Sequence, residues 1–308
     1  MEIALQFVLL ALGFVMLGKG ADWFVEGAAG IAMRFGIPQL VIGLTIVAMG
    51  TSAPEAAVSI AAAVKGNADI TIGNIVGSNI LNILVILGLA ASIVPIAVAR
   101  STVRIEIPFM IAVTALLFYQ GRDGSISLAD GGVLMVAFAA YMMYLYTMAM
   151  KSNVDSDLEE PGLPLGRCLL GAVGGLALII AGSNVTVGAA TSIATYAGLS
   201  ERFIGLTIVA LGTSLPELFT SVAAARRGNA DIAIGNIVGS NIFNILFVVG
   251  LSSLIIDIPF ASAFNFDTYV ALGAAVLLLL CVLRTQKLQR WAGALMLVCY
   301  AAYLGYIL

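Results

Sequence analysis

The chain has 308 residues, of which 61% are hydrophobic and only 10% are charged. Soluble domains are usually about 25% charged, and a globule of this length could not hide so much apolar surface from water. The formal charge of -3 excludes the basic surface of a nucleic-acid-binding protein. Histidine is absent, which excludes histidine-dependent catalytic triads and imidazole-ligated metal centres. The composition therefore predicts a polytopic membrane protein.

A membrane-spanning helix needs about 20 mostly apolar residues. Apolar runs separated by short polar segments predict ten such spans. They cover residues 3–33, 39–64, 70–95, 105–120, 126–149, 167–195, 202–225, 232–256, 267–283 and 290–308. The polar stretch 151–166 predicts a linker, so that residues 1–150 and 167–308 form two halves of five spans each.

The basic residues of the loops predict the orientation. If the loops alternate between the two sides of the membrane, ten cations fall on one side and three on the other, and the more basic side faces the cytoplasm. We therefore expect a multi-pass protein of the cell (inner) membrane, with both termini outside in the periplasm and a cytoplasmic linker. The ten cations are Arg34, Arg100, Arg104, Lys151, Arg167, Arg226, Arg227, Arg284, Lys287 and Arg290, and the three are Lys65, Arg122 and Arg202.

The two halves contain the same motif. Residues 43–89 align without a gap with residues 205–251, and 34 of the 47 positions are identical. Because each half has an odd number of spans, the second copy must cross the membrane in the opposite direction. Inverted repeats are an architecture of secondary transporters, whose substrate site lies between the repeats near the bilayer midplane. We therefore expect an all-α membrane protein built from two inverted five-helix repeats.

Each copy of the motif places a glutamate, Glu55 or Glu217, in the middle of an apolar span. A carboxylate at that depth costs on the order of 3 kcal/mol. Because no lysine or arginine lies in the interior of the second, third, seventh and eighth spans to pair with it, a bound cation is the simplest counter-charge. Two carboxylates match one Ca²⁺ or two Na⁺.

A proline precedes each glutamate, and it removes the hydrogen bond to the carbonyl four residues earlier. We therefore expect broken helices in the second and seventh spans, with free carbonyls near Ala48 to Thr51 and near Ala210 to Thr213 that line a cavity. Thr51 or Ser52 could cap the half-helix that begins at the proline. Breaks in the third and eighth spans are also considered.

The next span of each copy carries polar residues four positions apart, which places them on one helix face. Their oxygen atoms suit Ca²⁺ or Na⁺ rather than soft transition metals. We expect ligands at Ser78, Asn82, Ser240 and Asn244. Four further asparagines could equally well hold neighbouring helices together by hydrogen bonds: Asn74, Asn79, Asn236 and Asn241.

These motifs carry a family resemblance. GTSAPE (50–55) with GSNILN (77–82), and GTSLPE (212–217) with GSNIFN (239–244), resemble the signature motifs of the calcium/cation antiporter superfamily, specifically its prokaryotic Na⁺/Ca²⁺ exchanger branch. The resemblance implies an ion-binding core of spans two, three, seven and eight, across which spans one and six slide. It places ion ligands on Thr51, Ser52, Glu55, Ser78, Asn82, Thr213, Ser214, Glu217, Ser240 and Asn244, with the carbonyls of Ala48 and Ala210. Asn244 stands where some relatives, including potassium-dependent ones, carry aspartate, which argues against K⁺ co-transport.

The leading hypothesis is Na⁺/Ca²⁺ exchange by alternating access, with both ions competing for a midplane cage centred on Glu55 and Glu217. H⁺/Ca²⁺ antiport by the same carboxylates is the alternative, because protonation of both would also release one Ca²⁺. A calcium channel would also use acidic residues, but inverted halves favour a carrier. An intramembrane aspartyl protease would need two aspartates, and only Asp22 lies well inside a span. We expect no enzymatic activity, no cofactor and no obligatory protein partner, with Ca²⁺ and Na⁺ as substrates and the lipid bilayer as surroundings.

The first span contains three charged residues, Lys19, Asp22 and Glu26. Lys19 and Asp22 have the spacing of an ion pair within one helix. We expect these charges to be structural or to line the cytoplasmic vestibule rather than to bind the ion.

Overall fold

The computed structural model describes residues 2–66, 68–152, 164–198 and 210–307. Within these ranges, eight helices are long and apolar enough to cross a membrane, and a ninth span results if the bent pair Gln39–Thr51 and Ala53–Val64 is counted as one. The first part of the predicted span 202–225 lies outside the described residues. Positions 153–163 of the predicted linker also lie outside them. The fold is therefore a multi-pass helical membrane protein.

The first half runs from the N-terminus to the end of a long outer helix. Its elements are α1 (Glu2–Arg34), α2 (Gln39–Ile42), η1 (Gly43–Val47), α3 (Ala48–Thr51), α4 (Ala53–Val64), α5 (Asp69–Leu81), η2 (Asn82–Leu87), α6 (Gly88–Ile93), β1 (Ile96–Ala97), η3 (Thr102–Glu106), α7 (Ile107–Gln120), η4 (Gly121–Asp123), β2 (Ser125–Ile126) and α8 (Leu128–Ser152). The segments η1, η2 and η3 are π-helical turns that continue the neighbouring α-helices.

Where it is described, the second half repeats this order of elements except that η3 and η4 have no counterpart. Its elements are α9 (Leu165–Tyr196), α11 (Ala210–Thr213), α12 (Leu215–Arg226), α13 (Ala230–Phe243), η6 (Asn244–Val249), α14 (Gly250–Ile255), β3 (Ile258–Pro259), α15 (Ala263–Val282), β4 (Lys287–Leu288) and α16 (Arg290–Ile307). The polar residues on one face of α13 form a polar stripe that ends at Asn244, as the stripe of α5 ends at Asn82. A π-helical turn begins at each of these two asparagines.

The helix breaks lie where the prolines predict them. The second span bends by 51° between α3 and α4, and Ser52 at the bend has left the helical conformation, with φ -81° and ψ 6°. Ser214 separates α11 from α12 in nearly the same conformation, with φ -89° and ψ 3°. The third and eighth spans are unbroken over Ile70–Ile93 and Ala230–Ile255. These ranges contain no proline. Each includes a π-helical turn, in which the backbone hydrogen bonds span five residues instead of four, and the helix continues through it.

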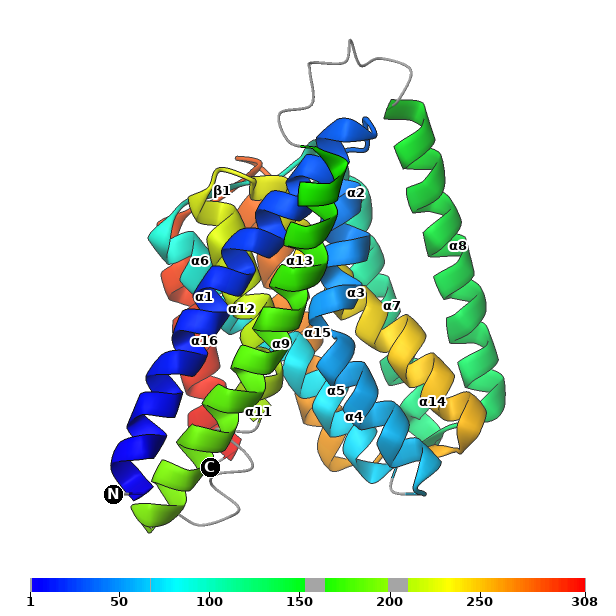
Figure 1. Cartoon of the computed structure of the whole chain (residues 1–308). Coiled ribbons are helices and arrows are strands. Elements are labelled where there is room, and N and C mark those ends of the chain that lie inside the picture. The colour runs from blue at the N-terminus through cyan, green and yellow to red at the C-terminus, as the bar shows by residue number, and fades with distance from the viewer. Residues whose placement is uncertain (1, 67, 153–163, 199–209, 308) are drawn as a thin grey trace.

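The third and eighth spans form the centre of the molecule. In their most apolar windows, 78% and 94% of the residues are buried, against 17% in the window of α8. The broken second span packs on this centre, because η1 and α3 contact α13. In Figure 1, α8 stands at one side of the bundle and α1 with α9 at another. The polar stripes therefore lie on the most enclosed helices of the protein.

The helices α1 and α9 lie side by side along most of their length (Figure 1). Glycines allow their backbones to approach closely. A Cβ atom added to Gly27 would lie 2.3 Å from the backbone nitrogen of Ala172, and one added to Gly175 would lie 2.4 Å from that of Phe24. Small residues let membrane helices pack at such close range. The two helices therefore form one tightly joined pair.

Two short antiparallel strand pairs join the halves. β1 pairs with β4 through Ile96 and Leu288, and β2 pairs with β3 through Ile126 and Ile258. The sequence repeat has an offset of 162 residues, and this offset relates β1 to β3 and β2 to β4. The two strand pairs are therefore equivalent under the repeat. The two halves thus make reciprocal contacts outside the repeated motif as well.

Candidate functional site

Each central glutamate sits in the first turn of a half-helix. Glu55 follows the bend into α4 and Glu217 follows the break before α12, and each side chain is only 1% exposed. In both half-helices the proline occupies one of the first two positions, where the absence of its N–H costs nothing. The positive end of the helix dipole therefore faces the carboxylate, which stabilises its charge.

The serines at the two breaks hold the glutamates across the repeat. The Ser52 hydroxyl donates to Glu217 Oε1 at 2.8 Å, and the Ser214 hydroxyl donates to Glu55 Oε1 at 3.3 Å. The expected capping by Ser52 or Thr51 is therefore wrong, because neither hydroxyl caps α4. Thr51 donates to Asn236 Oδ1 at 3.0 Å and to the Ala48 carbonyl at 3.3 Å. A buried carboxylate or amide oxygen needs a donor, and the hydroxyls supply it.

The asparagines of α5 and α13 form a reciprocal hydrogen-bonded cluster at the centre. Asn79 and Asn241 each donate to the other's backbone carbonyl at 3.1 Å. Asn82 donates to the side-chain oxygen of Asn241 at 2.9 Å, and Asn244 donates to that of Asn79 at 3.1 Å. Asn79 and Asn241 thus hold the two central helices together.

Asn74 and Asn236 have a similar structural role next to the glutamates. Each donates to the backbone carbonyl of the glutamate in its own half, at 3.3 Å to Glu55 and 3.4 Å to Glu217. Each also donates at 2.9 Å to a serine one turn further along the half-helix, Ser59 or Ser221. These bonds fix each half-helix against the neighbouring central span.

Four buried side-chain oxygens of the site have no hydrogen-bond partner within the described part of the chain. They are Glu55 Oε2, Glu217 Oε2, Asn82 Oδ1 and Asn244 Oδ1. These groups lie on elements that pack against each other across the repeat, because α4, which carries Glu55, contacts η6, which begins at Asn244, and α12, which carries Glu217, contacts η2, which begins at Asn82. Buried acceptors without a donor are costly, and a cation is the ligand that such oxygens prefer.

The remaining predicted ligands differ in their burial and in their hydrogen bonds. Ser78 and Ser240 are buried one turn before Asn82 and Asn244. The Ala48 carbonyl is not free as expected, because it accepts bonds from the Ser52 N–H, the Thr51 hydroxyl and the Ser240 hydroxyl. The helix continues to Thr51, and its last turn satisfies this carbonyl. In the second half, Ala210 and Thr213 are the first and last residues of α11, and Thr213 is half-buried.

No basic side chain neutralises the glutamates in the described ranges. The two salt bridges found there both involve Arg227, which binds Asp22 at 3.3 Å and Glu26 at 3.0 Å. The pairing of Lys19 with Asp22 that their spacing allows is not formed among the described residues. Arg227 lies at the end of α12, which packs along α1, and it reaches both carboxylates of α1 at once.

Comparison with known proteins agrees with this architecture. The profile of the sodium/calcium exchanger protein family matches residues 5–147 and 168–308. The chain belongs to the sodium/calcium exchanger family. It is 41% identical to a putative antiporter, CaxA, of Alkalimonas amylolytica over 99% of this chain and 98% of that protein. It is 33% identical to the sodium/calcium exchanger MaX1 of Methanosarcina acetivorans over 98% of both chains. A structure of the sodium-calcium exchanger NCX_Mj superposes with a TM-score of 0.87, at 34% identity, over 99% of this chain and 100% of that one.

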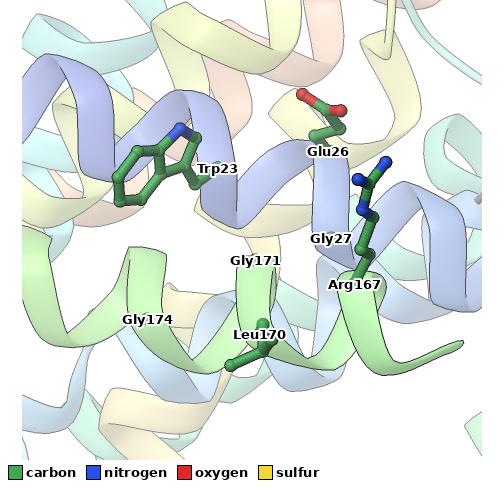
Figure 2. Close-up of a pocket in the computed structure, with 7 residues that line it drawn as sticks. All are labelled: Trp23, Glu26, Gly27, Arg167, Leu170, Gly171 and Gly174. Atoms are coloured by element: carbon green, nitrogen blue, oxygen red, sulfur yellow. The ribbon is translucent and has the colours of Figure 1, made fainter. Parts of the chain in front are cut away.

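Members of this family are membrane transporters and not enzymes, so the cluster at Glu55 and Glu217 is a candidate transport site. It is distinct from a hollow of 530 Å³ that is lined by residues of α1 and α9. Figure 2 shows this hollow between Trp23 of α1 and Leu170 of α9, where the backbones of Gly27 and Gly171 approach. None of the predicted ion ligands lines it.

Sequence reasoning missed one buried acid of this exchanger-family chain. Glu106, at the end of η3, is completely buried and accepts a hydrogen bond from the Tyr144 hydroxyl of α8. It falls at the start of the predicted span 105–120, two residues after Arg104, and was not singled out there. The available signal was that a carboxylate inside an apolar span is costly.

Proposed function

We propose that the protein exchanges Na⁺ for Ca²⁺ across the membrane by alternating access, with both ions competing for the site centred on Glu55 and Glu217. The observation that carries the proposal is the set of four buried, unpartnered oxygens on these glutamates and on Asn82 and Asn244. Two carboxylates and two amide oxygens form the hard donor set that Ca²⁺ and Na⁺ share.

Charge balance explains why the two ions exclude one another. One Ca²⁺ or two Na⁺ would neutralise the two glutamates, whereas both loads together would leave excess positive charge in a low-dielectric site. The hydroxyls of Ser52 and Ser214 already hold one oxygen of each glutamate, so the other oxygens stay available to the ions. The names of the relatives MaX1 and NCX_Mj support Na⁺ as the coupling ion. Thr51, Ser78, Thr213 and Ser240, with the carbonyls of Ala48 and Ala210, complete the proposed ligand set.

We further propose ten spans in two inverted repeats, with residues 1–150 and 167–308 as the repeats and 151–166 as a cytoplasmic linker. The reciprocal hydrogen bonds between Asn79 and Asn241 support this arrangement, since these residues differ by 162 positions, the offset of the sequence repeat. The same offset relates the Ser52–Glu217 hydrogen bond to the Ser214–Glu55 hydrogen bond, and one strand pair to the other. Both termini would then lie outside in the periplasm, in keeping with the distribution of basic residues.

Alternating access requires one part of the molecule to move against the other. The α1–α9 pair is suited to this movement, because its backbones are in close contact along the pair and it stands at the edge of the bundle. The core that holds the ions would then stay in place while the pair moves across it.

The test is Ca²⁺ flux in proteoliposomes that contain the purified protein. We expect an imposed Na⁺ gradient to drive Ca²⁺ in the opposite direction, with no effect of a K⁺ gradient of the same size when the membrane potential is clamped. Ca²⁺ movement that ignores the Na⁺ gradient would contradict the proposal. If a pH gradient drives the flux without Na⁺, the same carboxylates serve H⁺/Ca²⁺ antiport instead.

A further inference from the structure

A second buried carboxylate lies at a cavity outside the proposed transport site. The cavity has a volume of about 290 Å³ and lies between η3 and the start of α7 on one side and α8 on the other. Its rim includes Ile105 and Ala140, which are exposed on the outer surface of the bundle. Because α8 is a candidate membrane span with few buried residues, this rim faces the lipid.

The floor of the cavity is polar and incompletely paired. Glu106 is 0% exposed, and its Oε1 atom accepts the Tyr144 hydroxyl while its Oε2 atom has no partner in the described part of the chain. Tyr141 is 4% exposed, and its hydroxyl also has no hydrogen-bond partner among the described residues. Buried polar atoms are nearly always satisfied, so two open positions at one cavity indicate a ligand.

Among the described residues that line the cavity, Glu106 is the one acid and none is basic. A second half-buried acid, Asp231, lies in the first turn of α13, a helix that contacts α7. Neither acid has a salt bridge to a described lysine or arginine. The ligand that offsets this charge is therefore a cation.

The walls of the cavity are apolar and aromatic. The rings of Phe109 and Tyr141 stack with centroids 5.3 Å apart, and the Tyr144 ring lies 6.4 Å from that of Tyr141. The volume is far larger than a dehydrated Na⁺ or Ca²⁺ requires, and apolar walls cannot solvate such an ion. Aromatic faces and apolar walls suit an organic cation with a hydrocarbon chain.

We propose that this cavity binds a primary ammonium group carried on an apolar chain, which enters from the bilayer between α7 and α8. One N–H of the ammonium would donate to Glu106 Oε2 and another to the Tyr141 hydroxyl, while the chain would leave past Ile105 and Ala140. Glu106 lies at the fifth position of the span Thr102–Asp123, a depth that an amphiphile head group at the membrane interface can reach. Both an aminophospholipid and a free alkylamine present this chemistry.

The test measures binding to the purified protein in a neutral detergent. Dodecylammonium should raise the melting temperature, dodecanol should not, and dodecyltrimethylammonium should bind about tenfold more weakly because it has no N–H to donate. Equal binding of dodecanol or of the trimethyl compound would overturn the proposal. Native mass spectrometry with phosphatidylethanolamine, phosphatidylcholine and phosphatidylglycerol then separates the sources. Selective retention of the ethanolamine lipid assigns the site to a phospholipid, and its absence with dodecylammonium still bound assigns it to a free amine.

Variants tie the binding to the cavity. Glu106→Gln should weaken dodecylammonium binding about tenfold. Asp267→Asn is the matched control, because Asp267 accepts a tyrosine hydroxyl at 2.8 Å from Tyr303 in another helix pair and should leave binding unchanged. If Glu106→Gln does not fold, Ala140→Trp fills the cavity from the exposed face of α8 and should abolish the melting shift. Unchanged binding in Ala140→Trp, or a melting shift with KCl alone that depends on Glu106, would overturn the assignment. These readouts do not depend on Ca²⁺ transport.

Discussion

Glu55 and Glu217 each have one carboxylate oxygen held by a serine of the opposite half and one oxygen without a partner in the described part of the chain. The serine bond fixes the orientation of the carboxylate, and the second oxygen stays available. An arrangement of this kind stabilises the protein less than a fully paired network would, because unsatisfied buried acceptors are costly. That cost is accounted for if a cation occupies the site during part of the transport cycle.

We predict that Glu55→Gln or Glu217→Gln abolishes Ca²⁺ exchange, with a fall of about 100-fold or more in initial rate, while the protein still folds. The amide keeps the shape and the serine hydrogen bond but removes the charge that attracts the ion, and the loss of a buried charge does not destabilise the fold. Flux in proteoliposomes and the elution profile of the purified protein measure the two effects.

Asp267→Asn serves as the control for these variants, because it neutralises another carboxylate within a span that makes no contact in the proposed site. Exchange should remain close to that of the unchanged protein. Undiminished exchange in either glutamate variant would show that the ion binds elsewhere.

At the level of helices, the close packing of α1 on α9 depends on glycines that face the partner helix. Gly175 lies against the backbone of Phe24, and Gly182 lies against that of Leu17. The neighbouring Gly174 has open space in the direction of a side chain. Two adjacent glycines of one helix thus differ in the space available for a side chain, and the sequence does not distinguish them.

We predict that Gly175→Leu lowers the stability of the protein by about 1–3 kcal/mol and slows exchange, because the side chain forces α1 and α9 apart. Gly174→Ala should be neutral or slightly stabilising, since alanine is the better helix former by about 1 kcal/mol. Melting curves of the two variants in the same detergent measure the difference. A loss of stability in Gly174→Ala as large as that in Gly175→Leu would show that the interface is not the cause.

At the scale of the whole molecule, the two halves are not equivalent in charge. Arg227 at the end of α12 joins Asp22 and Glu26 of α1. The repeat offset relates Arg227 to Lys65, and relates the two acids to Asn184 and Gly188. Among the described residues, the ion-pair cluster therefore exists at one end of the molecule only. If the halves exchange conformations during transport, this cluster favours the state in which α1 stays against α12.

We predict that Arg227→Gln shifts the population away from that state by a few-fold, because partly exposed ion pairs contribute only about 0.2–1 kcal/mol each. Spin labels on α1 and α12 would report the change as a longer distance between the helices. Asp22→Asn with Glu26→Gln should produce the same shift, and adding Arg227→Gln to that pair should produce none beyond it. An additive shift in the triple variant would contradict the role of the ion pairs.

The mirrored experiment adds the missing acids at the other end. Asn184→Asp with Gly188→Glu supplies partners for Lys65, which is exposed and has no salt bridge among the described residues. The population should then move in the direction of Arg227→Gln. A shift in the opposite direction would show that the ends do not exchange roles.

The sequence by itself determined the class of the protein, the repeat, the broken second span and the two central glutamates. Each of these depends on local or nearly local properties: apolar length, the identity of aligned positions, the missing N–H of proline, and the cost of a carboxylate inside an apolar run. The identity of the family follows from the same motifs, and the comparisons confirm it.

Only the tertiary structure decided which polar groups are satisfied. Ser52 looked like a cap for its own half-helix and instead binds Glu217, 165 residues away. The Ala48 carbonyl looked free and is bonded, and Asp22 pairs with Arg227 rather than with Lys19. Glu106, which the sequence did not distinguish, is buried at a cavity. Hydrogen bonds and ion pairs are directional and act over a few ångströms, so they depend on which helices meet and at what height. Apolar patterning, which acts through the burial of whole surfaces, fixes the spans but not these contacts.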